Sequence, residues 1–212
     1  MIDQHELLLF IPAMLAITFM PGPDMLFVLA QSAHGGARQG IVGVLGIISG
    51  GCVHITAAAL GLSALIFQSA FLFSLVKIAG AAYLIFLGLR TLFARDQAPP
   101  ANAADGRPAG DNWTAYRRGF ITNVLNPKVA LFMLAFLPQF VVPANGHVGL
   151  QIATLGAIWF GTGLVVLCGV ALAGGAVEGL RRRSSRARTI ERVLTGSIFL
   201  GLGLRVALPD RR

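Results

Sequence analysis

The chain has 212 residues, of which 55% are hydrophobic and only 12% are charged, and its mean hydropathy is +0.73. A soluble domain would carry about twice that charged fraction, so the composition excludes a disordered chain and argues against a soluble enzyme. The 26 glycines and 10 prolines fit a polytopic membrane protein, because both residues are commoner in transmembrane helices than in soluble ones. The net charge of +8 first suggests an acidic partner such as nucleic acid.

Long segments without any charged residue predict the transmembrane helices. No Asp, Glu, Lys or Arg occurs between Arg38 and Lys77 or between Lys128 and Glu178, and each gap exceeds the ~20 residues that cross a bilayer. We expect six helices, at about residues 7–33, 41–67, 70–93, 116–142, 149–174 and 190–208. The first is interrupted at Pro21-Gly22-Pro23-Asp24 and the fourth at Asn126-Pro127-Lys128. The acidic N-terminus lacks the basic start and the cleavage site of a signal peptide, so the first helix is expected to be retained.

Residues 95–115 differ from the rest, because they are rich in Pro, Gly and Asp and nearly free of large apolar side chains. Such a segment buries too little apolar surface to order itself, so we expect a flexible cytoplasmic loop. It joins two halves, residues 1–94 and 116–212.

Basic residues gather in the loops that follow helices one, three and five. These loops hold twelve of the seventeen: Arg38, Arg90, Arg95, Arg107, Arg117, Arg118, Arg181, Arg182, Arg183, Arg186, Arg188 and Arg192. The positive-inside rule then places these loops in the cytoplasm and both termini outside. The net charge is thereby explained as membrane topology, and no nucleic-acid partner is expected. The basic C-terminus leaves open a shallow sixth helix or a five-helix topology.

The two halves look like copies of one another. Phe86-Leu87-Gly88-Leu89-Arg90 closes the third helix as Gly201-Leu202-Gly203-Leu204-Arg205 closes the sixth, and Pro23-Asp24 corresponds to Pro127-Lys128. Because three helices is an odd number, the second copy must be inverted in the membrane. The predicted fold is therefore an all-α polytopic membrane protein of two inverted three-helix repeats, whose first and fourth helices are broken by proline. Inverted repeats with matching broken helices are typical of secondary transporters.

Asp24 and Lys128 are the sharpest functional signals, because an ionisable residue at membrane depth usually faces a cavity or a partner. They have opposite charges at corresponding positions, so they could neutralise one another when the site is empty. A zwitterionic substrate could then place its ammonium group near Asp24 and its carboxylate near Lys128, and protonation of Asp24 would couple transport to the proton gradient. The alternative is a structural salt bridge that locks the two halves.

The remaining site candidates surround the two breaks. Gly22, Pro23 and Pro127 interrupt helices and free backbone groups that can bind a ligand, unless the kinks serve packing alone. Asn123 and Asn126 carry amides that suit an amino-acid ligand, or they cap the broken helix. His54 is either a proton relay or, as we prefer, a structural residue.

Two further patterns bear on packing and cofactors. The stripe Gly40, Gly43, Gly46 and Gly50 most simply lets the second helix pack closely on a neighbour, and it would also allow a homodimer. The sequence carries no metal-ligand spacing, no Walker loop and no dinucleotide fingerprint, so we expect no cofactor.

Three motifs in order resemble the LysE/RhtB family of amino-acid exporters. They are Pro21-Gly22-Pro23-Asp24, the run Gly36-x-Arg38-x-Gly40-x-x-Gly43-x-x-Gly46, and Gly119-Phe120-x-x-Asn123-x-x-Asn126-Pro127-Lys128 with Phe132 and Pro138-Gln139-Phe140. The resemblance implies a multi-pass protein of the bacterial inner membrane that exports amino acids or close derivatives, such as threonine, homoserine, lysine or homoserine lactone. It also implies proton-motive force as the driver, a lipid bilayer and a small-molecule substrate as partners, and importance for Gly22, Pro23, Asp24, Asn126, Pro127 and Lys128.

A different class of function stays open as the alternative. A transmembrane thiol-redox shuttle of the CcdA/DsbD kind would use Cys52 and Cys168, one in each half, although neither lies beside a proline break. A membrane scaffold protein would leave Asp24 and Lys128 without a purpose.

Overall fold

The computed structural model describes residues 2, 4–68 and 111–183, together with residues 71, 75, 78, 79, 81, 82, 85, 86, 89, 92, 93, 189, 193, 197, 200, 201 and 204. These residues form helices and turns and contain no strand, which confirms the all-α class. Only scattered residues of the predicted third and sixth helices, 70–93 and 190–208, are described, and these residues are helical. Six helices and two repeats therefore stay predictions.

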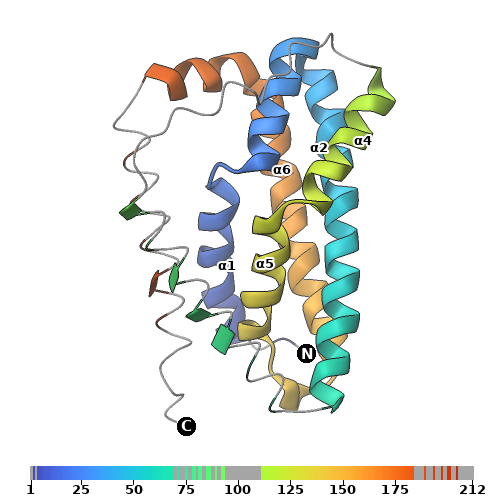
Figure 1. Ribbon diagram of the computed structural model, residues 1–212, viewed down its shortest axis with the longest axis vertical. Helices are drawn as coiled ribbons and strands as arrows, with labels where there is room; N and C mark the ends of the chain where they lie inside the picture. The colour runs from blue at the N-terminus through green and yellow to red at the C-terminus, as the bar shows by residue number, and fades with distance from the viewer. Residues whose placement is uncertain are drawn as a thin grey trace.

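The first predicted helix is broken where the prolines indicate. α1 spans Gln4–Phe19, and α2 begins at Pro23 and runs to Gln68, so residues 20–22 separate them. Proline suits the first position of a helix, because its missing N–H has no partner there in any case and its φ is already helical. The break thus ends one helix and starts the next along a similar direction (Figure 1).

α2 consists of two helical arms that fold back on each other at Gly36. This glycine has φ 74°, which is in the left-handed region that side chains avoid. Beyond it the chain returns, so that Gly40 lies against Ser32 and Gly43 against Phe27. The second predicted helix was expected to begin near residue 41, but the helix resumes directly after Gly36, because a single glycine makes the turn.

The fourth predicted helix is also broken, into α4 (Asn112–Val124) and α5 (Pro127–Ala135). The flexible loop was expected to extend to residue 115, but α4 already begins at Asn112. Asp111 caps this helix by accepting the Thr114 N–H at 2.9 Å. Hydrogen bonds from Thr114 also hold the pKa of the Asp111 carboxyl below its ordinary value, so this cap stays charged at neutral pH. Residues 95–110 lie outside the described part of the chain.

Two short 3₁₀ helices, η2 (Leu137–Phe140) and η3 (Pro143–Asn145), lead into α6 (Val148–Arg183). The buried Gln151 fastens this connection, since its side chain bonds Val142 N and O, each at 3.0 Å, and Gly146 O. α6 was expected to end near residue 174. The helix instead continues to Arg183, and its last part turns away to lie across the end of the bundle (Figure 1).

The helices form one bundle in which the two broken segments run in opposite directions (Figure 1). The turn at Gly36, the start of α4 and the C-terminal part of α6 lie at one end, and the N-terminus and the α5–α6 connection lie at the other. The exposed Arg38 and Arg117 therefore share an end, as the positive-inside prediction requires. The antiparallel course of the broken segments is also what inverted repeats would produce.

The surface of the bundle fits a lipid environment. Leu8, Leu60, Val165 and Leu172 are each about 70% exposed, which is normal for a helix that faces acyl chains. Among the described residues, Pro23–Gly61 and Val148–Gly174 are long and apolar enough to span a membrane, and α4 with α5 and η2 forms a third candidate bent by 47°. The chain is a multi-pass membrane protein.

Glycines of α2 let α4 approach closely, as the stripe predicted. Gly46 lies against the backbone of Tyr116 and Phe120, so a methyl group there would overlap backbone atoms, and a methyl group at Gly50 would lie only 3.0 Å from Asn123. From the other side, Gly119 of α4 lies against the Gly43 carbonyl. This packing inside the chain fixes α4, and hence Asn123 at its end, against the second arm of α2.

We predict that Gly46→Ala lowers the free energy of unfolding by about 1–3 kcal/mol, because the added methyl meets backbone atoms that cannot rotate away. Gly61→Ala in the same helix is the control. Its methyl meets no atom of the described residues within 4 Å, and the gain in helix propensity is up to about 1 kcal/mol. Thermal unfolding of the purified proteins in detergent compares them, and equal stability of both variants would contradict the close packing.

Candidate functional site at the helix breaks

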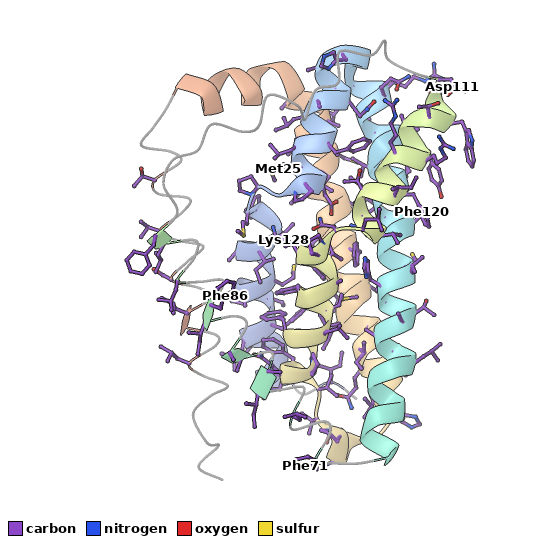
Figure 2. The ribbon with its side chains drawn as sticks, viewed as in Figure 1. Met25, Phe71, Phe86, Asp111, Phe120 and Lys128 are labelled. Atoms are coloured by element: carbon purple, nitrogen blue, oxygen red, sulfur yellow. The ribbon has the colours of Figure 1, made fainter. Side chains whose placement is uncertain are left out.

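Lys128 ties the two helix breaks together near the middle of the bundle. Its ammonium group, on the first turn of α5, donates to Met20 O at 3.0 Å and approaches Ile17 O at 3.4 Å. In Figure 2, Lys128 and Met25 lie close to the level at which α1 ends and α2 begins. The last carbonyls of a helix carry partial negative charge and lack partners within the helix, so a cation there is favourable.

Asp24 makes the reciprocal tie. It lies in the first turn of α2, where the helix dipole favours a carboxylate, and its Oδ2 accepts the Asn123 Nδ2–H at 2.8 Å. Asn123 is fully buried in the last turn of α4. Each break therefore supplies a side chain that bonds the other, Lys128 to the end of α1 and Asn123 to the start of α2.

The second arm of α2 braces this arrangement through His54. The His54 Nε2 lies 3.1 Å from the Asn123 carbonyl oxygen, so that nitrogen carries the donated hydrogen. His54, like Lys128, also lies near Asp24. This bond to a backbone carbonyl is consistent with a structural role for His54, which stays a prediction.

Asp24 and Lys128 line one cavity, together with Gly22 and Asn126. The cavity has a volume of about 70 Å³. Asp24 Oδ1 is buried and makes no hydrogen bond of normal geometry with a described residue, although the Asn126 amide lies near the carboxylate. Because a buried carboxylate oxygen without a partner is costly, this atom is a ready acceptor for a cationic group or a proton.

Asn126 is both a helix cap and a cavity residue. Its side chain accepts the Lys128 backbone N–H at 3.0 Å at the start of α5, and only 3% of the residue is exposed. Gly22 brings the backbone close to the lysine, since a Cβ there would lie 3.3 Å from Lys128 Nζ. The rings of Pro23 and Pro127 are exposed, so these two residues act on the site by setting where α2 and α5 begin.

The structure thus brings Gly22, Asp24, Asn123, Asn126 and Lys128 to one place. Sequence reasoning did not find the aromatic wall that completes it, formed by Trp159 and Phe160 of α6. An aromatic residue in an apolar helix gives no signal of which way it faces.

The two cysteines take no part in this site. Cys52 is exposed on the second arm of α2, Cys168 is partly buried on α6, and both are free thiols. Neither is among the described residues that line the cavity. Nothing in this geometry supports a thiol-redox shuttle.

Comparison with known proteins gives a consistent set of relatives. The family model described as LysE type translocator matches residues 15–209. The uncharacterized membrane protein YrhP of Bacillus subtilis is 31% identical over 97% of this chain and 100% of its own length. The leucine efflux protein of Salmonella typhimurium is 28% identical over 90% of this chain and 89% of its own length. No solved structure matches.

The cap at Asn126 can be separated from any binding role. We predict that Asn126→Ala lowers the free energy of unfolding by about 1 kcal/mol, because the start of α5 loses its side-chain acceptor. Asn126→Ser keeps an acceptor and retains most of that stability. Thermal unfolding in detergent measures both, and equal losses for Ser and Ala would show that the cap contributes nothing.

Proposed function

This chain belongs to the LysE type translocator family, and we propose that it exports amino acids from the cytoplasm through the cavity between its two helix breaks. It is a membrane transporter, not an enzyme. The relatives named leucine efflux proteins support an amino acid as the cargo. The observation that carries the proposal is one cavity lined by Asp24 and Lys128, two side chains of opposite charge in an apolar bundle.

The two charges fit the two ends of a zwitterion. The α-ammonium group of the substrate bonds Asp24 Oδ1, the buried oxygen that has no partner among the described residues. The α-carboxylate accepts a hydrogen bond from the Lys128 ammonium group. Lys128 then gives up part of its hydrogen bonding to Met20 O. Charge-assisted bonds of this kind are about twice as strong as neutral ones, and they offset the loss of hydration of the substrate.

Asp24 also supplies a route for coupling to the proton gradient. One carboxylate cannot hold a proton and a substrate ammonium group together, so each displaces the other. A proton that binds Asp24 from outside releases the substrate there, and a substrate that binds from the cytoplasm releases the proton inside. The exchange moves one proton inward for each amino acid that leaves, which requires the bacterial inner membrane, where the proton-motive force is held.

The test replaces each charge with its neutral isostere. We predict that Asp24→Asn and Lys128→Gln each lower export by roughly tenfold to a hundredfold, because a charge-assisted bond contributes about 1.5–3 kcal/mol. The assay is efflux of radiolabelled leucine from preloaded vesicles that contain the purified protein, with internal pH followed by a fluorescent dye.

Asp111→Asn is the matched control. It removes the same charge at an exposed position and keeps a good helix cap, so export is expected to be unchanged. Normal, proton-coupled export by Asp24→Asn would contradict the coupling scheme. If Asp24→Asn and Lys128→Gln fail only because they unfold, thermal unfolding shows it, and the pair is then a structural lock.

A further inference from the structure

The wall of the cavity beyond its two charges is mainly apolar. Among the described lining residues, the arms of α2 contribute Met25, Ile47 and Ile48, and α6 contributes Trp159, Phe160 and Leu167. Thr18 also lines the cavity, but its hydroxyl hydrogen is donated to Met14 O of its own helix at 2.8 Å. Apart from Lys128, the side-chain donors that remain in the described lining are the Trp159 indole N–H and the Asn126 amide, so most of the wall offers only apolar contacts to a substrate side chain.

The charge balance of the cavity points the same way. Asp24 and Lys128 are the ionisable side chains among the described lining residues, and their charges cancel. A zwitterionic head group uses both. A cationic side chain such as that of lysine would then lie against apolar walls without a carboxylate, and burying an unpaired charge is strongly unfavourable.

Gly163 shapes the wall where the side chain of a substrate would lie. It lines the cavity, and a Cβ at this position would meet no atom of the described residues within 4 Å. A larger residue at position 163 would therefore project into open space beside the described lining. A Cβ at Gly161, about half a turn away on α6, would also meet no atom of the described residues within 4 Å. Gly161 is exposed, however, and is not among the described lining residues.

We propose that the cargo is a zwitterionic amino acid with an apolar side chain, and that Gly163 is the residue that sets how large that side chain can be. This inference rests on the proposed function and narrows the range of cargoes, from threonine to lysine, that the family resemblance implies. In this proposal the apolar part of the cavity contacts the side chain of the substrate, whereas Asp24 and Lys128 bind its head group.

The first experiment compares matched cargoes in vesicles that contain the wild-type protein. Norleucine is the apolar counterpart of lysine, and valine is that of threonine. We expect norleucine to leave at least tenfold faster than lysine, and valine up to about a hundredfold faster than threonine, which is the discrimination that an apolar pocket achieves against an added hydroxyl. Equal rates for norleucine and lysine would overturn the cargo class and leave an amino-acid exporter. Export of no amino acid at all would overturn the proposed function and this inference together.

The second experiment changes Gly163. Gly163→Val is expected to lower leucine export at least tenfold, mainly through a higher KM, and to change alanine export less than threefold, because only the larger side chain needs the space beside residue 163. Gly161→Val is the control and should leave both rates unchanged.

Two results would contradict the role of Gly163. One is an equal loss of leucine and alanine export by Gly163→Val in folded protein, and the other is no loss of either. If Gly163→Val does not fold, Gly163→Ala replaces it, since alanine raises helix propensity and adds one methyl to the same space. Its leucine-to-alanine export ratio must then fall below that of the wild type, and an unchanged ratio would count against the proposal.

Discussion

An interrupted helix inside a membrane exposes backbone groups that lipid cannot satisfy, and the described part of the chain contains two such interruptions at proline. Lys128, at the start of α5, bonds the carbonyls at the end of α1, and His54 bonds the Asn123 carbonyl at the end of α4. The Asn123 side chain also donates to the Asp24 carboxylate at the start of α2, which joins the two breaks. Each break is therefore held in part by a side chain from the other break. Because the partners lie about 100 residues apart in the chain, the arrangement also fixes how the two halves meet.

The same bonds that stabilise the breaks leave one oxygen of Asp24 without a bond of its own, and the proposed cargo site uses this atom. Asp24 uses Oδ2 for Asn123 and keeps Oδ1 buried without a partner among the described residues, and Lys128 reaches the same cavity. An exporter of zwitterions gains from this arrangement, because an incoming substrate exchanges with bonds that already exist and does not have to create a charged site from an apolar one. The strength of the ties therefore limits both how stable the empty bundle is and how readily it binds and releases its cargo.

Much of this was visible in the sequence, and what was missed has two physical reasons. Asp24 and Lys128 stood out because charge is scarce in the apolar segments, and the prolines marked the breaks. The turn at Gly36, the start of α4 at Asn112 and the bond from His54 to Asn123 were not foreseen, since a turn made by one residue and a bond to a backbone carbonyl leave no pattern of residue types. The wall of Trp159 and Phe160 was hidden for another reason. In a membrane both faces of a helix are apolar, so hydrophobic periodicity does not tell the face that lines a cavity from the face that meets lipid.

The central claim is that one site binds both charged ends of a zwitterion. Competition between cargo analogues tests this claim most directly. Vesicles that contain the purified protein are loaded with radiolabelled leucine together with an unlabelled analogue, and the efflux of the labelled leucine is measured. Leucinol keeps the ammonium group without the carboxylate, and 4-methylpentanoate keeps the carboxylate without the ammonium group. The account predicts that unlabelled leucine competes at least tenfold better than either analogue, and that Lys128→Gln removes the difference between leucine and leucinol. Equal competition by leucine and both analogues would show that the two charges do not hold the cargo.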